Sequence, residues 1–184
     1  ACVATVVNKE DVEGPPAPPL PPAPPPASPP QPLPALLLRG VFALRIASGS
    51  NPGKAIHVYA NQDIPDLSQY SLGVANNGGG TDGAEFGLPS RPASAGEDII
   101  VVRESLQPMV GHLCPFAQNH TVTTNKLSQN GDDAIELFQQ VDGAWQVIDT
   151  FGHPHVDGTG EPWEYTYSWA YRTALAPGGF NVND

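Results

Sequence analysis

The chain has 184 residues, and 19 acidic against 8 basic side chains give it a net charge of −11. Binding to a nucleic-acid backbone needs a basic face, so this charge excludes nucleic acid as an expected partner. The sequence contains no run of eighteen apolar residues, so we expect no membrane insertion either.

The first thirteen residues combine a short apolar run with a charged one. Residues 1–7, ACVATVV, are small or β-branched and favour a strand, whereas residues 8–13, NKEDVE, are mostly charged. A strand this short has no partner for its own backbone groups, so it could add to a sheet edge of its own domain or of a neighbouring copy. We interpret residues 1–13 as an N-terminal arm, and the residues expected to make this contact are Val3, Thr5, Val6 and Val7.

Residues 14–35 form a proline-rich linker that carries no charge and has thirteen prolines. Proline lacks the amide donor and fixes φ, so this segment is predicted to be a polyproline II rod. The twenty residues from Pro15 to Pro34 would span about 60 Å, whereas a 150-residue domain is roughly 40 Å across. A rod of this length favours contacts that reach outward over a fold back onto the same domain.

From residue 36 onward, short apolar runs alternate with turn residues and no long amphipathic helix is visible. This pattern predicts an all-β domain over residues 36–184, an antiparallel β-sandwich with Greek-key connections. Residues 104–120 are expected to form a long loop or a short helix. The predicted strands lie within residues 36–47, 54–60, 69–75, 84–89, 97–103, 121–124, 133–138, 144–151 and 167–172.

Aromatic side chains recur at every second position near the end of the domain. This spacing predicts a row on one face of a strand, made of Trp163, Tyr165, Tyr167, Trp169 and Tyr171. The three tryptophans, which include Trp145, are expected to be largely buried.

Two polar turns have a physical explanation in the sequence. Asp66 and Ser68 can cap a tight turn that docks the apolar residues beside them. The Asn-Gly pair at 130–131 tolerates positive φ, and the carboxylates of Asp132 and Asp133 can accept backbone N–H bonds.

The candidate chemistry is sparse. His153, His155 and Asp157 could bind a metal ion, but a spacing of two around a proline is no ligand signature. Asp132, Asp133 and Asp157 could share calcium, but they lack the D-x-D-x-D-G loop. Nucleophile, zinc-protease and P-loop motifs are missing as well. We therefore expect no catalytic centre, no metal and no cofactor.

Three long motifs resemble the lamin tail domain family in the type found on secreted microbial proteins. They are GSNPGKAIHVYANQDIPDLSQYSL, NGDDAIELF followed by VIDTFG, and VDGTGEPWEYTYSWAYR, spread over roughly residues 40–172. The resemblance implies an immunoglobulin-like β-sandwich that binds or scaffolds and is often appended to enzymes without supplying their active site. The chain departs from the pattern at His57, where the family commonly has Glu, and at Asn61, which is displaced by Ala60.

Cysteine usage and one sequon favour an extracellular protein. The two cysteines, Cys2 and Cys114, and the sequon at Asn119 fit an oxidising secretory route, and the chain opens as a mature chain could after signal cleavage. We predict a disulfide between Cys2 and Cys114 of neighbouring copies; a bond within one chain and two free thiols are the alternatives. Asn119 is expected to carry an N-glycan if the source is eukaryotic.

Together these features predict a secreted, non-enzymatic structural subunit that binds copies of itself. An arm that docks on a neighbour is a head-to-tail contact, which produces a filament unless the rotation closes. A glycoprotein coat, with a hydroxylated and glycosylated rod, is a variant of this hypothesis. The alternative is a binding or targeting module of a larger secreted enzyme, for example a nuclease, or of a surface protein.

Overall fold

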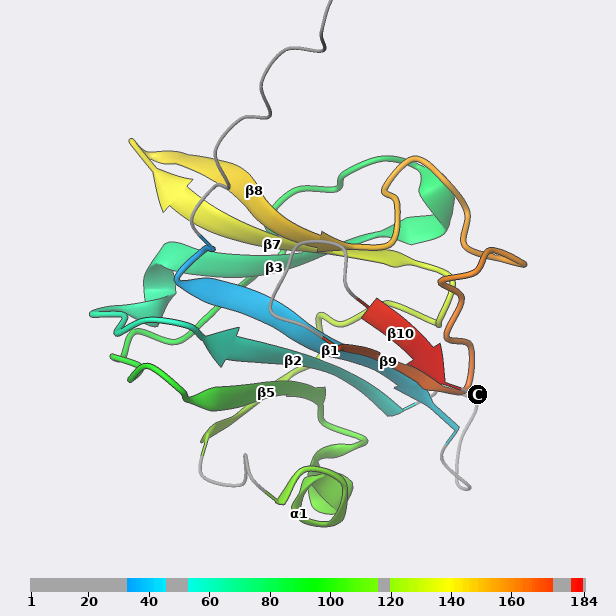
Figure 1. The fold of residues 1–184 in the computed structure, drawn as a ribbon, viewed down its shortest axis with the longest axis horizontal. Coiled ribbons are helices and arrows are strands. Elements are labelled where there is room, and N and C mark those ends of the chain that lie inside the picture. The colour runs from blue at the N-terminus through cyan, green and yellow to red at the C-terminus, as the bar shows by residue number, and fades with distance from the viewer. Residues whose placement is uncertain (1–32, 46–52, 116–119, 174–179, 184) are drawn as a thin grey trace, which may run out of the picture. The chain divides into compact units, whose positions relative to one another are not determined.

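The described part of the chain forms ten β-strands in two sheets, with very little helix (Figure 1). The computed structural model describes residues 33–45, 53–115, 120–173 and 180–183. The strands are β1 (Leu36–Leu44), β2 (Gly53–Ala60), β3 (Tyr70–Ala75), β4 (Phe86–Gly87), β5 (Asp98–Arg103), β6 (Thr121–Thr124), β7 (Ala134–Val141), β8 (Ala144–Phe151), β9 (Trp169–Arg172) and β10 (Phe180–Asn183). Three 3-10 turns, η1 (Leu67–Gln69), η2 (Asn76–Gly78) and η3 (Gln107–Met109), and the helix α1 (Val110–Leu113) complete the elements.

The six-stranded sheet has the order β10-β9-β1-β2-β5-β6, and the four-stranded sheet has the order β4-β3-β7-β8. All strand pairs are antiparallel except β5 with β6. The predicted all-β, sandwich-like character is therefore confirmed. Each predicted strand segment overlaps one of β1 to β9, whereas β10 was not predicted.

The main core lies between the two sheets. Leu38, Val58 and Val101 come from the six-stranded sheet, and Leu72 and Leu137 come from the four-stranded sheet. In each strand the side chains alternate across the sheet, so these residues share the inner face.

Strand β5 is apolar on both faces because both of its faces are covered. Ile99 and Val101 belong to the main core, whereas Ile100 and Val102 pack in a second cluster with residues of the segment that holds η3 and α1. The short helical segment predicted within residues 104–120 is thus confirmed, and it covers the outer face of the six-stranded sheet. In the described part of the chain, no helix is long and apolar enough to cross a membrane.

The prediction that the tryptophans are largely buried was wrong for Trp145 and Trp169, which are 41% and 37% exposed. Trp145 lies on β8, which is an edge strand, and Trp169 lies on the outer face of β9. The predicted aromatic row is also wrong as a single strand face. Tyr167 has a φ of 58°, which breaks the extended backbone, and β9 begins only at Trp169. Trp163 is half-buried.

Candidate functional site

The hairpin of β7 and β8 ends the four-stranded sheet and exposes an edge. Its turn is Asp142-Gly143, with φ values of 51° and 82°, as a two-residue type I′ turn requires. The register pairs Val141 with Ala144 directly beside this turn. The turn therefore fixes which backbone groups of β8 face β7.

Next to a two-residue turn, the first pair of residues exchanges both main-chain hydrogen bonds, and bonded and non-bonded pairs then alternate. Trp145 and Val147 fall in non-bonded pairs, opposite Gln140 and Phe138. Their N–H and C=O groups consequently point away from β7, toward the open side of the sheet. The edge thus presents two donors and two acceptors in extended geometry.

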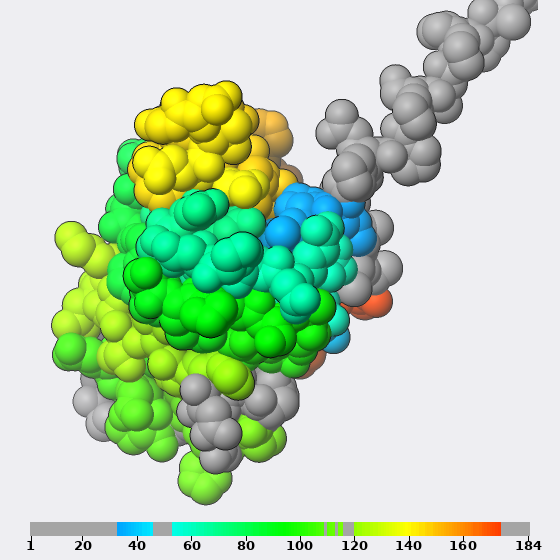
Figure 2. All heavy atoms as spheres, turned by 90° about the vertical axis from the view of Figure 1, so that its left-hand side faces the viewer, coloured from blue at the N-terminus to red at the C-terminus, as the bar shows by residue number. Residues whose placement is uncertain are grey.

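The side chains on this edge are exposed and uncharged. Trp145 is 41% exposed and Val147 is 45% exposed, and the run Ala144 to Ile148 carries no charge. In Figure 2 the hairpin, in yellow, forms the top of the body. Natural edge strands usually carry charges or proline that block pairing with another strand, and this edge carries neither.

The other half of β8 is anchored in the sandwich. Asp149 accepts two hydrogen bonds from Arg172 Nη2 of β9, at 2.7 and 2.9 Å, and one from the Leu38 N–H of β1 at 2.9 Å. Both side chains of the ion pair are buried. The two sheets are therefore tied together at Asp149, and the exposed half of β8 projects from a fixed base.

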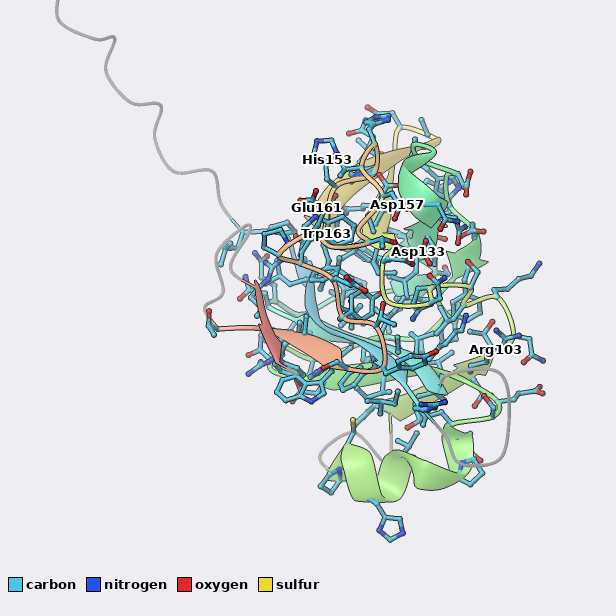
Figure 3. All side chains as sticks on the ribbon, turned by 90° about the vertical axis from the view of Figure 1, so that its right-hand side faces the viewer. Arg103, Asp133, His153, Asp157, Glu161 and Trp163 are labelled. Atoms are coloured by element: carbon cyan, nitrogen blue, oxygen red, sulfur yellow. The ribbon has the colours of Figure 1, made fainter. Side chains whose placement is uncertain are left out.

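A second candidate site is a groove of about 410 Å³ at the end of β8. Trp163 forms part of its wall, with His153 and Glu161 beside it (Figure 3). A Cβ added to Gly152 or Gly158 would lie 2.9 or 2.5 Å from the Trp163 ring, so both glycine backbones pack against that ring. The ring is thereby held in one position before any ligand arrives.

The residues weighed for metal binding make local turns. His153 Nδ1 accepts the His155 N–H at 3.2 Å, and Asp157 accepts the Thr159 N–H at 3.0 Å. Asp132 accepts the Thr159 hydroxyl at 3.0 Å. In the parts of the chain that the structure describes, no three such side chains are grouped closely enough to hold a metal ion.

Asp133 plays the turn role that the sequence predicts. Its carboxylate accepts the N–H groups of Asn77 and Asn130, at 2.8 and 2.9 Å, and so links two loops. Burial raises the pKa of Asp133, and these two hydrogen bonds oppose the rise. Gly131 has a φ of 113°, in agreement with the expected Asn-Gly turn.

The first polar turn is confirmed as well. Asp66 accepts the Ser68 N–H at 2.9 Å. The apolar residues beside it, Leu67, Tyr70 and Leu72, are buried in the main core.

His57 is the centre of a polar network on the outer face of the six-stranded sheet. Its Nε2–H donates to Asp98 Oδ1 at 2.8 Å, and its Nδ1 accepts from the Tyr171 hydroxyl. Only neutral His57 can donate at one nitrogen and accept at the other. The side chain is 1% exposed, and burial lowers its pKa to about 4, against the opposing effect of Asp98.

Sequence reasoning missed the exposed edge and the buried ion pair. A charge-free run directly after an Asp-Gly turn was the available signal for the edge. The sequence does not say which strand ends a sheet, because that depends on pairing between distant segments.

The remaining predicted site residues fall partly outside the described residues. Cys2, Asn119 and the arm residues Val3, Thr5, Val6 and Val7 all lie there. Cys114 is described: it is a free thiol, 5% exposed, in the cluster beneath α1. Burial raises the pKa of this thiol, so the unreactive protonated form is favoured.

Comparison of the chain with protein-family models, with curated proteins and with solved structures found no match. The resemblance of residues 40–172 to lamin tail domains therefore stays a prediction, and it rests on the sequence motifs alone.

Proposed function

We propose that this protein is a non-enzymatic, extracellular structural subunit that assembles with copies of itself through its N-terminal arm. The observation that carries the proposal is the open edge of β8, with its outward main-chain groups and the exposed side chains of Trp145 and Val147. An uncharged edge of this kind is a template for another strand. Strand addition is also the contact that the apolar run at residues 1–7 would make.

The proline-rich linker gives the assembly its direction. A polyproline II rod from Pro15 to Pro34 would hold the arm about 60 Å from the body. The arm of one copy and the edge of the next are different surfaces, so the contact is heterologous and can repeat without closing. A head-to-tail filament is the expected product.

We also propose that the body is an immunoglobulin-like sandwich of the lamin tail type. Support comes from the motif around Asp66, whose Ser68 N–H bond and buried Leu67 give that motif a folding role. An experimental structure of the body, compared strand by strand with lamin tail domains, tests this assignment.

The assembly proposal is tested by electron microscopy of negatively stained protein at increasing concentration. The full chain is expected to form regular fibres, whereas a variant that lacks residues 1–13 is expected to stay dispersed. Fibres of the same appearance from both proteins would contradict the proposal.

The groove at Trp163 favours a second candidate function, a binding module. An aromatic ring fixed between two glycine backbones, with His153 and Glu161 beside it, suits a ligand with an apolar face and several hydroxyl groups. Titration with a neutral β-linked glucose hexamer, followed by tryptophan fluorescence, tests this function. Saturable binding that Glu161→Ala weakens would support it, and no change up to millimolar sugar would count against it.

A further inference from the structure

We infer that the acceptor for the arm is the free edge of β8 at residues 144–147, and that its occupant is the run 1–7 of a second copy. This inference rests on the proposed function and names the surface on which the assembly depends.

The length of the open edges favours β8. The two sheets end in β10, β6, β4 and β8, which have four, four, two and eight residues. Paired backbone is gained residue by residue along an edge, so β8 offers the longest template. Trp145 and Val147 supply two N–H donors and two C=O acceptors on the side away from β7.

The composition of the chain outside the described residues singles out the donor. A strand that pairs on both sides of its backbone needs N–H groups, which excludes the proline-rich segment 14–32. The segments 46–52 and 174–179 contain both glycine and proline, and 116–119 has only four residues. Residues 1–7 contain neither proline, glycine nor charge.

Both faces of the donor match the edge. Side chains alternate along an added strand, so Val3, Thr5 and Val7 would share one face, and Cys2, Ala4 and Val6 the other. Either face can cover the exposed Trp145 and Val147 without burying a charge. The pairing would therefore remove exposed apolar surface and satisfy free main-chain groups together.

The stiffness of the linker favours a second copy over the same chain. The body begins with β1 at Leu36, and a rod of twenty residues would place the arm about 60 Å from that point. A body of this size is roughly 40 Å across. A straight rod therefore carries the arm past its own β8, to the edge of a neighbour.

Lysine substitutions on the edge test the inference. Trp145→Lys with Val147→Lys places two charges where the arm would pair, and the concentration at which fibres form should rise by at least about tenfold. Thr123→Lys on the exposed edge of β6 is the matched control and should assemble like the parent protein. Unchanged far-ultraviolet circular dichroism checks that each variant is folded.

Cross-linking gives a second readout that does not depend on the stability of the lysine variant. In a Cys114→Ser background, Trp145→Cys, Gln146→Cys or Val147→Cys should form a disulfide with Cys2 of another copy, seen as a ladder on a non-reducing gel. The control Thr123→Cys should give no ladder.

The outcomes separate this inference from the proposed function. If deletion of residues 1–13 abolishes fibres but the β8 variants assemble normally and only Thr123→Cys cross-links, the acceptor is β6 and the inference is overturned. No cross-link at any of the four positions, with fibres intact, also overturns it. If fibres form without residues 1–13, the proposed function itself fails.

Discussion

Neutral His57 links three strands through two hydrogen bonds of opposite sense. Nε2–H donates to Asp98 of β5, and Nδ1 accepts from Tyr171 of β9, while His57 itself belongs to β2. Protonation would turn the accepting nitrogen into a donor that faces the Tyr171 hydroxyl. A buried imidazole in this position stabilises the fold only while it is uncharged.

This network predicts a pH dependence of stability. The unfolded chain takes up a proton at His57 near pH 6.5, but the folded protein resists it down to about pH 4. The contribution is therefore complete above about pH 6.5 and is lost as the pH falls toward 4, with a total of about 3 kcal/mol. Urea unfolding of the parent protein and of His57→Gln, at pH 7 and at pH 4.5, measures it.

Glutamine offers a donor and an acceptor but does not titrate in this range. The parent protein should therefore lose more free energy of unfolding between the two pH values than His57→Gln does. Equal losses in the two proteins would show that His57 is not the titrating group.

Several single-residue roles were predictable because they are local. The cap at Asp66 and the carboxylate at Asp133 depend on residues two or three positions away, apart from the bond of Asp133 to Asn77. The partners of His57 were not predictable, since Asp98 and Tyr171 are 41 and 114 residues distant. The exchange of the family's Glu for His57 marked the position but not the contacts.

At the scale of strands, β1 and β9 fit together because Gly40 has no side chain. The Tyr171 ring lies over Gly40, and an added Cβ would be 2.6 Å from it. Gly40→Ala should therefore displace Tyr171 from His57 and cost about 1–3 kcal/mol of stability. Gly87→Ala is the matched control, since an added Cβ there meets nothing within 4 Å, and thermal unfolding should barely change.

The ion pair between Asp149 of β8 and Arg172 of β9 joins the two sheets. Asp149→Ala leaves a buried guanidinium without its carboxylate and should cost about 3–5 kcal/mol. The double variant Asp149→Leu, Arg172→Met removes both charges and should recover part of this loss. Urea denaturation of the three proteins measures the coupling. A double variant less stable than Asp149→Ala would contradict the explanation.

The strands themselves were predictable because their signal is local. The continuous apolar run of β5 indicated burial on both faces, and the structure supplies both covers. The edge position of β8 was not predictable, because it follows from which strand pairs with β7 on its other side. For the same reason Trp145 was expected to be buried: a tryptophan on a strand indicates a covered face only if another layer covers it.

For the whole molecule, the position of Cys114 restricts how copies can be linked. The thiol lies beneath α1 on the outer face of the six-stranded sheet, whereas the proposed acceptor β8 belongs to the other sheet. An arm on β8 would therefore keep Cys2 away from the Cys114 of the same neighbour. The predicted disulfide and the β8 contact exclude each other within one pair of copies.

With the arm on β8, we expect two free thiols that differ in reactivity. Cys2 should react rapidly with a thiol reagent in native buffer, and Cys114 only after unfolding, because it is buried and protonated. Thiol titration with and without urea measures both. A ladder of native protein on a non-reducing gel that collapses with reductant, and that Cys114→Ser abolishes, would instead support the Cys2–Cys114 bond.

The central claim is that the arm of one copy binds the β8 edge of another. Sedimentation velocity of an equimolar mixture tests it most directly, with one partner lacking residues 1–13 and the other carrying Trp145→Lys and Val147→Lys. Each protein alone has only one half of the contact, so each should sediment as a monomer, and the mixture should form a one-to-one complex. A mixture that sediments as the two separate monomers would contradict the account.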